Sequence, residues 1–279
     1  MTTLHRLPLT PPPIRNETLG SYLHRLAMAN NRPARSLAAL LGPPPIGFSP
    51  ISDDTSGWTP QSPANLAALT GRRVEKLARA LPALASFLAV PCDHPTQLIG
   101  RACRCCSARR RAGTASVFTY IPIHQHLCIR HQRWTRATID IPLAKLPAVL
   151  QAQHRLTRLA HRHRSDEIKD AFCSAQKILR GWTTTQLPID LTPDWNSRLE
   201  RIRDHPPGRG ISSQDQQLVA SFPDTVTLTA LVLSPPTGSD ARTTYLAATT
   251  ELEDRYARPY NAPGIRDPLY QYFRKSQIA

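Results

Sequence analysis

The chain has 279 residues, of which 35 are Lys or Arg and 20 are Asp or Glu, which gives a formal net charge of +15 at pH 7. Hydrophobic residues make up 41% of it, and no apolar run approaches the roughly 20 residues that span a bilayer, which argues against a membrane protein. The first 16 residues also lack the long apolar stretch of a secretory signal, so we expect a soluble intracellular protein.

Helical spacing begins directly after a proline-containing lead-in, residues 1–16. Apolar residues recur at helical spacing over residues 17–30 and predict an amphipathic helix there. A second short helix is expected to end near Gly42, and residues 43–60, rich in Pro, Gly, Ser and Asp, are predicted to form a loop.

Two further short helices are predicted around Thr70-Gly71, within residues 62–82. Pro63 favours a helix start, and the glycine separates "PANLAAL" from "RVEKLARAL". This outline is that of a helix-turn-helix, but any helical hairpin can look the same. The pattern therefore leaves two interpretations open: a DNA-reading unit and a purely structural hairpin.

The rest of the chain predicts a small ribbon followed by helices. Residues 91–135 contain the β-prone segment "SVFTYIPI" between Cys and His residues, which suits a short ribbon held by metal. After it we expect helices, the fourth of them interrupted at Pro223, over residues 145–163, 166–180, 193–204, 213–234, 243–257 and 267–276. The predicted fold is mainly α, with an N-terminal helical, helix-turn-helix-like part (1–90), a zinc ribbon (91–140) and a C-terminal helical domain (141–279).

The positive charge is concentrated in the middle of the chain. Residues 101–164 hold thirteen Lys and Arg residues and one acid, Asp140, for a net charge of +12, whereas the other 215 residues contribute only +3. Clustered Lys and Arg gain affinity for phosphates by releasing counterions, so nucleic acid is the favoured partner. An acidic protein and a membrane surface are the alternatives that charge alone leaves open.

The cysteines and histidines near this charge have the spacing of a zinc site. Cys103 and Cys106 form a C-x2-C pair, Cys128 and His131 form a C-x2-H pair, and 21 residues lie between the pairs. Structural zinc takes four such ligands in a tetrahedron from two close pairs. Since disulfides rarely persist in a reducing compartment, we predict Zn²⁺ as the cofactor.

The other thiols and imidazoles nearby are expected not to bind the metal. Cys105 fits the turn less well than its neighbours, and Cys92 and Cys173 lack close partners and are predicted to be buried structural thiols. His124 and His126 alternate on a strand-like stretch, where one can point inward. Four ligands fill the zinc shell, and no phosphate loop, nucleophile elbow or zinc-deaminase motif occurs, so we predict no catalytic residues and no enzyme activity.

Two stretches, taken together, resemble the TniQ family of transposon target-selection proteins, and a third is more weakly similar. The first is "LPLTPPPIRNETLGSYLHRLAMAN", with Glu17-Thr18-Leu19 before a helix that carries Ser21 and Arg25. The second is "RACRCC…YIPIHQHLCIRHQRW", similar to the family's zinc block C-x-x-C…C-x-x-H-x-x-W, which would end here at Trp134. The third and weaker one is "FPDTVTLTALVLSP". Larger relatives carry a further C-x-x-C unit, which this chain lacks beyond His131.

The resemblance implies a non-enzymatic adaptor that links a target recogniser to the AAA+ ATPase regulator of a transposase. Some members recognise DNA themselves, and others attach to a CRISPR effector complex. A cytoplasmic, nucleoid-associated location is expected. A free-standing, zinc-containing DNA-binding regulator that uses the 62–82 helices is the alternative.

The arginines beside the two Cys/His pairs are the predicted phosphate contacts. Closing a zinc tetrahedron would bring the arginines after the first pair and those around the second pair to one end of the ribbon. The combined charge of three thiolates and Zn²⁺ is too small to neutralise these arginines. Pairing with Asp166, Glu167 and Asp170 is the alternative explanation. The predicted nucleic-acid-binding residues are Arg109, Arg110, Arg111, Arg130, Arg133 and Arg136.

Overall fold

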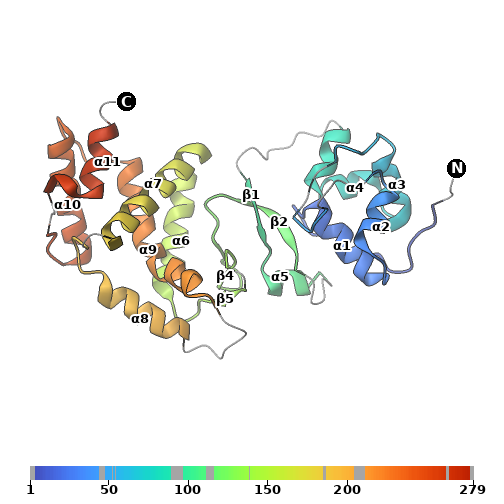
Figure 1. Ribbon diagram of the computed structural model, residues 1–279, viewed down its shortest axis with the longest axis horizontal. Helices are drawn as coiled ribbons and strands as arrows, with labels where there is room; N and C mark the ends of the chain where they lie inside the picture. The colour runs from blue at the N-terminus through green and yellow to red at the C-terminus, as the bar shows by residue number, and fades with distance from the viewer. Residues whose placement is uncertain are drawn as a thin grey trace. The chain divides into compact units, whose positions relative to one another are not determined.

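The computed structural model is mainly helical, with a few short strands, as predicted (Figure 1). It describes residues 4–43, 48–51, 53, 55–88, 97–110, 116–137, 139–184, 187–203, 211–261 and 264–276. The chain divides into two compact units, residues 1–123 and 124–279. The three-part division at residues 90 and 140 stays a prediction. No helix of the described residues is long and apolar enough to cross a membrane.

The first unit combines short helices with a two-stranded hairpin. Helix α1 begins directly after Thr18, whose hydroxyl caps it by accepting a hydrogen bond from the Ser21 N–H at 3.2 Å. Helix α3 ends at Gly71, whose φ of 64° is the left-handed conformation that glycine adopts at helix ends. The elements are α1 (Leu19–Ala29), α2 (Ala34–Ala39), α3 (Ser62–Thr70), α4 (Val74–Ala78), the 3-10 helix η1 (Pro82–Leu88), β1 (Gln97–Arg101), α5 (Arg104–Ala108) and β2 (Phe118–Pro122).

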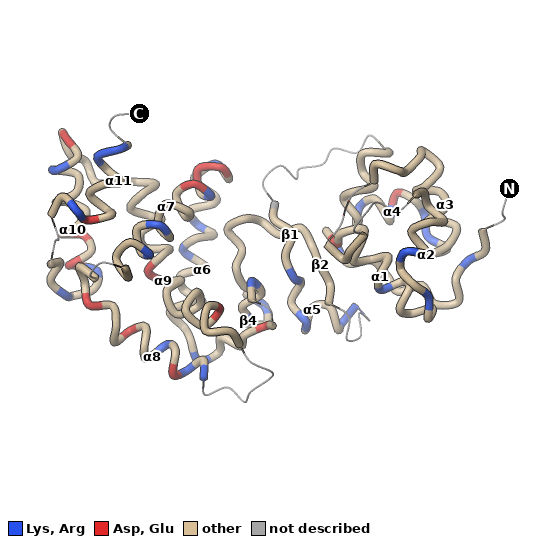
Figure 2. Tube along the Cα trace, viewed as in Figure 1, with Lys and Arg blue, Asp and Glu red and all other residues tan. Residues whose placement is uncertain are grey.

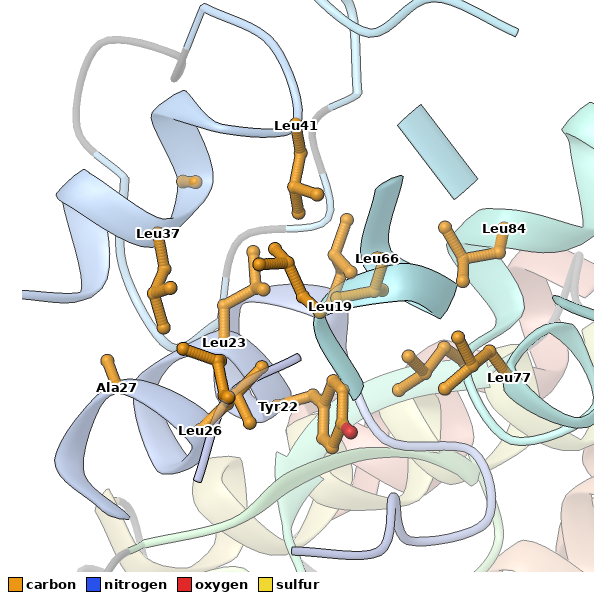
Figure 3. Close-up of a cluster of buried hydrophobic side chains, with 14 of the residues drawn as sticks. Leu19, Tyr22, Leu23, Leu26, Ala27, Leu37, Leu41, Leu66, Leu77 and Leu84 are labelled. Atoms are coloured by element: carbon orange, nitrogen blue, oxygen red, sulfur yellow. The ribbon is translucent and has the colours of Figure 1, made fainter. Parts of the chain in front are cut away.

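Leucines from several helices form the core of this unit (Figure 3). The apolar face of α1 supplies five residues that are almost fully buried and recur at helical spacing: Leu19, Tyr22, Leu23, Leu26 and Ala27. Side chains of α2, α3, α4 and η1 pack against this face, and their buried members include Leu37, Leu66, Leu77 and Leu84. Burying a leucine stabilises a fold by about 1.5–3 kcal/mol, so this cluster is what holds the short helices together.

The hairpin is attached to the start of α1. Strands β1 and β2 pair antiparallel, with Arg101 opposite Phe118. The other edge of β2 bonds to the chain before α1, since the Thr18 N–H donates to the Phe118 carbonyl at 2.9 Å. The Ser21 hydroxyl accepts from the Phe118 N–H at 3.1 Å. Hydrogen bonds from the start of α1 thereby hold β2 in place. Strand β2 in turn pairs with β1, which leads to Cys103.

The second unit consists of three very short strands and a set of longer helices. Strands β3, β4 and β5 form one antiparallel sheet in that order. Helix α9 packs against α6, α7 and α8, and α11 packs against α7 and α10 (Figure 1). The elements are β3 (Leu127–Cys128), β4 (Arg133–Trp134), β5 (Ile141–Pro142), α6 (Pro147–Ala160), α7 (Ser165–Thr184), α8 (Thr192–Arg203), α9 (Ser213–Leu233), α10 (Ala241–Tyr256), the 3-10 helix η2 (Gly264–Arg266) and α11 (Pro268–Ser276).

Two buried carboxylates organise the interior of this unit. Asp267 Oδ1 accepts from the Trp182 indole at 2.9 Å, and Oδ2 accepts from the Tyr245 and Tyr260 hydroxyls at 2.8 and 2.6 Å. Asp224 of α9 likewise accepts from Trp195, Arg198 and Tyr256. A buried carboxylate without such donors would be strongly destabilising, so these bonds specify how the last helices pack.

Helix α9 continues through Pro223, so the predicted interruption there is wrong. Proline removes the N–H that would bond to the carbonyl four residues earlier, and its ring normally kinks a helix. Here the next carbonyl, that of Ala220, accepts a hydrogen bond from Arg198 of α8, and the Thr227 hydroxyl donates to the Pro223 carbonyl at 3.1 Å. Side-chain donors and the packing of α6, α7 and α8 keep the helix continuous.

Candidate metal centre

The first Cys pair lies where strand β1 ends and helix α5 begins. Cys103 is buried and is the N-cap residue of α5, and the Ala102 N–H bonds to the Val117 carbonyl at 2.9 Å, extending the hairpin. The Ser107 N–H and hydroxyl both donate to the Cys103 carbonyl, at 3.0 and 3.1 Å. These bonds fix the turn from Cys103 into the first residues of α5, where Cys106 follows three positions later.

The second pair lies in the turn between β3 and β4. Cys128 pairs with Arg133 across the two strands, so the chain reverses direction over residues 129–132. Gln132 has a φ of 48°, a left-handed conformation that is uncommon for residues other than glycine. The Leu143 N–H donates to the Gln132 carbonyl at 2.8 Å, so the strained residue is held from the β5 side.

The structure brings the four predicted ligands together. One candidate ligand atom from each of Cys103, Cys106, Cys128 and His131 lies within 4.8 Å of all the others. The Cys128 Sγ and His131 Nδ1 atoms are 3.6 Å apart. An ion at about 2.3 Å from sulfur and about 2.0–2.1 Å from nitrogen separates two tetrahedral ligands by about 3.6 Å, so this spacing fits a shared metal.

Cys105 does not belong to this cluster, as expected from its place in the turn. It lies one residue before Cys106 on α5, and successive residues of a helix point about 100° apart. Cys173 is exposed on α7, so its predicted burial is wrong, because it faces away from the helices that cover α7. Cys92 lies outside the described residues.

Gln153 of α6 holds the segment that leads into the second pair. Its side chain is buried, its Oε1 accepts from the His126 N–H at 3.0 Å, and its Nε2 donates to the His124 carbonyl at 2.9 Å. The Thr135 N–H adds a bond to the His126 carbonyl at 3.1 Å. Sequence patterns alone predict no role for Gln153. The signal that could have found it is a polar residue between Val149 and Leu156 on the apolar face of a helix.

His126 points inward, into an aromatic cluster of the second unit. Its ring stacks on Phe172 and Trp134, with centroids 4.7 and 5.6 Å away, and is tilted against Phe222 at 5.0 Å. Burial lowers the pKa of His126 to about 3, so the ring is neutral at pH 7. This ring packs under β3 and β4 instead of joining the metal ligands.

The predicted phosphate-binding arginines differ in exposure. Arg109, Arg110 and Arg130 are exposed, and Arg133 is half-buried. Arg136 is half-buried as well, and its Nε donates to the Gln125 carbonyl at 3.2 Å. Arg111 lies outside the described residues. In Figure 2, Lys and Arg mark the trace at β1 and α5, whereas residues of both signs mark α8 and α10.

The acids proposed as alternative partners of these arginines have other partners nearby. Asp166 Oδ2 lies 3.0 Å from Arg164 Nη2, and Glu167 Oε2 lies 3.7 Å from His163 Nδ1. Both pairs are short-range contacts at the start of α7. The two contacts give no support to a structural pairing of Asp166 or Glu167 with the arginine group.

The fold and this site define a class: a helical protein with a Cys3His cluster able to hold a metal ion. The comparison with family models makes the assignment specific, since residues 8–133 match the TniQ family. This segment is therefore similar to the TniQ family, in agreement with the resemblance seen in the sequence. The match includes all four residues of the cluster. Searches of curated proteins and of solved structures found no match.

Proposed function

We propose that this protein is a non-enzymatic adaptor that selects targets for transposition. In this role it contacts target DNA, or a complex that recognises the target, and recruits the AAA+ ATPase regulator of the transposase. The observation that carries the proposal is the TniQ match over residues 8–133, together with the four-residue cluster inside the matched segment. A CRISPR effector complex is one recogniser to which such an adaptor can attach.

The metal in this proposal is a structural Zn²⁺ bound by Cys103, Cys106, Cys128 and His131. Three thiolates and one imidazole are a ligand set that zinc prefers, and four protein ligands leave no position for a reactive water. The ion would supply folding free energy to the two turns instead of chemistry. This argues for a scaffold role, in which the metal fixes the position of the basic residues around it.

The proposed DNA-contacting residues are Arg109, Arg110 and Arg111 after the first pair and Arg130 and Arg133 around the second. The exposure of Arg109, Arg110 and Arg130 supports a role in contacting phosphate. Arg136 is the sixth proposed contact, and its Nε donates to the Gln125 carbonyl. A DNA-bound adaptor would be nucleoid-associated in the cytoplasm.

A free-standing DNA-binding regulator is the second candidate, and one observation favours it. Arg73, Lys76 and Arg79 are all exposed; Lys76 lies on α4, the second helix of the 62–82 pair, and the two arginines are its cap residues. Cations on and beside one short helix suit phosphate contacts of a helix that lies on DNA. Against it, α4 has only five residues, Val74–Ala78, which is short for a recognition helix.

Affinity capture separates the two candidates. Tagged protein would be recovered from cells that carry the transposon genes, treated with nuclease, and its partners identified by mass spectrometry. The adaptor role predicts that the AAA+ ATPase stays bound after nuclease treatment. Recovery of DNA alone, footprinted as two symmetric half-sites, would support the regulator and contradict the adaptor.

A further inference from the structure

A cavity of about 790 Å³ lies wholly within the second unit, between helices α7, α8 and α9. This volume is within the range of about 300–1,000 Å³ that is typical of ligand sites. It lies outside the Cys/His cluster and outside the segment that matches the TniQ family. The inference is therefore independent of the proposed transposition role.

Each of the three helices presents one stripe of residues to the cavity. The lining positions on α7 and α8 follow the spacing i, i+3, i+4 and i+7, beginning at Gln176 and Thr192. Four of the six on α9 follow the same spacing from Gln214, and Ala220 and Thr225 line the cavity as well. Residues at this spacing share one face of a helix. Helices α7, α8 and α9 therefore turn one face each towards a common space.

The chemistry of the stripes suits an amphipathic segment. Trp195, Leu199 and Leu218 supply apolar surface, and Leu218 is 39% exposed, while amide and hydroxyl side chains make up most of the remainder. Arg180 is the single charged residue that lines the cavity; it is exposed and forms no ion pair within the described part of the chain.

Trp195 is a pre-ordered anchor in this cavity. Its indole donates to Asp224 Oδ2 at 2.7 Å, and the same carboxylate accepts from Arg198 at 2.8 Å and from the Tyr256 hydroxyl at 2.9 Å. A tryptophan fixed in this way loses little conformational entropy on binding, which is the property of residues that dominate protein interfaces.

We propose that this cavity binds an amphipathic helix of a partner protein, with apolar residues facing Trp195, Leu199 and Leu218 and a carboxylate facing Arg180. A helix that binds in a groove contacts it through apolar side chains at helical spacing, and the apolar residues of the three stripes would contact such a face. A second copy of this chain is disfavoured by its net charge of +15. Nucleic acid is disfavoured because one cation lines the cavity, too few for phosphate recognition.

A phage-displayed library of 16-residue helical peptides, randomised along one face, tests the proposal with the full-length, metal-loaded protein. Selected clones are expected to share apolar residues at i, i+3, i+4 and i+7 beside an Asp or Glu. The best clone, made as a labelled synthetic peptide, is then titrated by fluorescence anisotropy. Leu218→Arg, at the exposed lip of the cavity, should weaken its binding at least tenfold without changing the thermal unfolding midpoint.

A charge reversal on α7 provides the matched control. Arg180→Glu should weaken the acidic peptide about two- to fivefold, as expected for one exposed ion pair, and a Lys-substituted peptide should recover the loss. Lys177→Glu changes the net charge equally on the same helix but lies outside the cavity, so it should have no such effect. Equal losses for the two variants, or selected peptides that bind Leu218→Arg as well as the parent, would overturn the proposal. A dimer in analytical ultracentrifugation that Leu218→Arg dissociates would also overturn it, since the occupant would then be a second copy.

Discussion

Arg25 forms a two-point ion pair with Glu17 in the interior of the first unit. Its Nε lies 2.8 Å from Oε1 and its Nη2 lies 2.7 Å from Oε2, and the two side chains are 2% and 0% exposed. The Ser21 hydroxyl and the Ile14 N–H also donate to this carboxylate, both at 2.9 Å. Glu17, Ser21 and Arg25, which carry part of the family resemblance, thus form one buried network.

Removing one member of this network should be costly. Arg25→Ala leaves the Glu17 carboxylate buried without its counter-ion, and we expect a loss of about 3–5 kcal/mol in the free energy of unfolding. Denaturant titration of metal-loaded protein measures it. The control is the double variant Glu17→Gln/Arg25→Met, which leaves no buried charge and should cost clearly less. A loss below about 1 kcal/mol for Arg25→Ala would contradict the network as described.

The ligand set gives a second prediction. Cys128→Ala should bind much less than one equivalent of Zn²⁺ and lose the fold of the turns, because structural zinc binding is coupled to folding. Elemental analysis of purified protein, with circular dichroism, measures both effects. Cys105→Ser is the matched control and should retain the metal. Loss of zinc in the control but not in Cys106→Ser would mean that the first pair is wrongly assigned.

The left-handed residue in the second turn provides a third prediction. Glycine adopts a positive φ without the steric cost that other residues incur, so Gln132→Gly should preserve stability or raise it by up to about 1 kcal/mol. Gln132→Val, with a branched side chain at the same φ, should destabilise the protein. Thermal unfolding of the zinc-loaded variants compares them. The opposite order of stability would exclude this turn geometry.

The exposed arginines predict a salt-dependent affinity for DNA. Arg109→Ala/Arg110→Ala should weaken binding to any sequence and reduce the log–log slope of affinity against salt by up to about 2, if both contact phosphate. Arg32→Ala/Arg35→Ala removes the same charge from exposed positions around the start of α2 and should change the slope less. Fluorescence anisotropy at several salt concentrations gives both slopes. Equal slopes for the parent and the first variant, with zinc retained, would show that these arginines do not face DNA.

Tyr22 predicts a loss of stability at alkaline pH. Burial raises its pKa to about 12, above the value of about 10 in an unfolded chain. The neutral hydroxyl therefore contributes stability fully below pH 10, and this contribution falls by up to about 1.4 kcal/mol per pH unit as pH rises from 10 to 12. Tyr22→Phe should lack this slope. Burial also raises the pKa of Tyr256 and Tyr260, but these two residues are present in both the parent and Tyr22→Phe. The difference in unfolding free energy between the two proteins, measured against pH, therefore reports Tyr22 alone.

Much of this architecture follows from local sequence patterns. The spacing of leucines around Tyr22 predicts α1 and its buried face, and the two close Cys/His pairs predict the cluster, because both features depend on residues near one another in the chain. Gly71 likewise marks the end of α3. In these places local propensity and tertiary packing agree.

The features that could not be predicted depend on residues distant in sequence. Pro223 by itself indicates a helix break, whereas the bond from Arg198 of α8 and the packing of α6 and α7 on α9 involve residues far from it in the sequence. The role of Gln153 requires knowing which backbone groups lie above α6. The cavity requires the positions of three helices in space, although each stripe is visible as a periodic pattern once those positions are known.

The place of Asp267 near the end of the chain has a consequence for synthesis on the ribosome. Its partner Trp182 precedes it by 85 residues, so the Trp182 indole has no carboxylate acceptor from Asp267 until those residues have been translated. At about 5–20 residues per second, the delay is about 4–17 s, during which the interior of the second unit remains incomplete. All the buried leucines of the first core cluster, in contrast, have been made by residue 84. The protein is therefore expected to fold in order, with an early-formed N-terminal unit and a C-terminal unit that closes only when its last helix emerges.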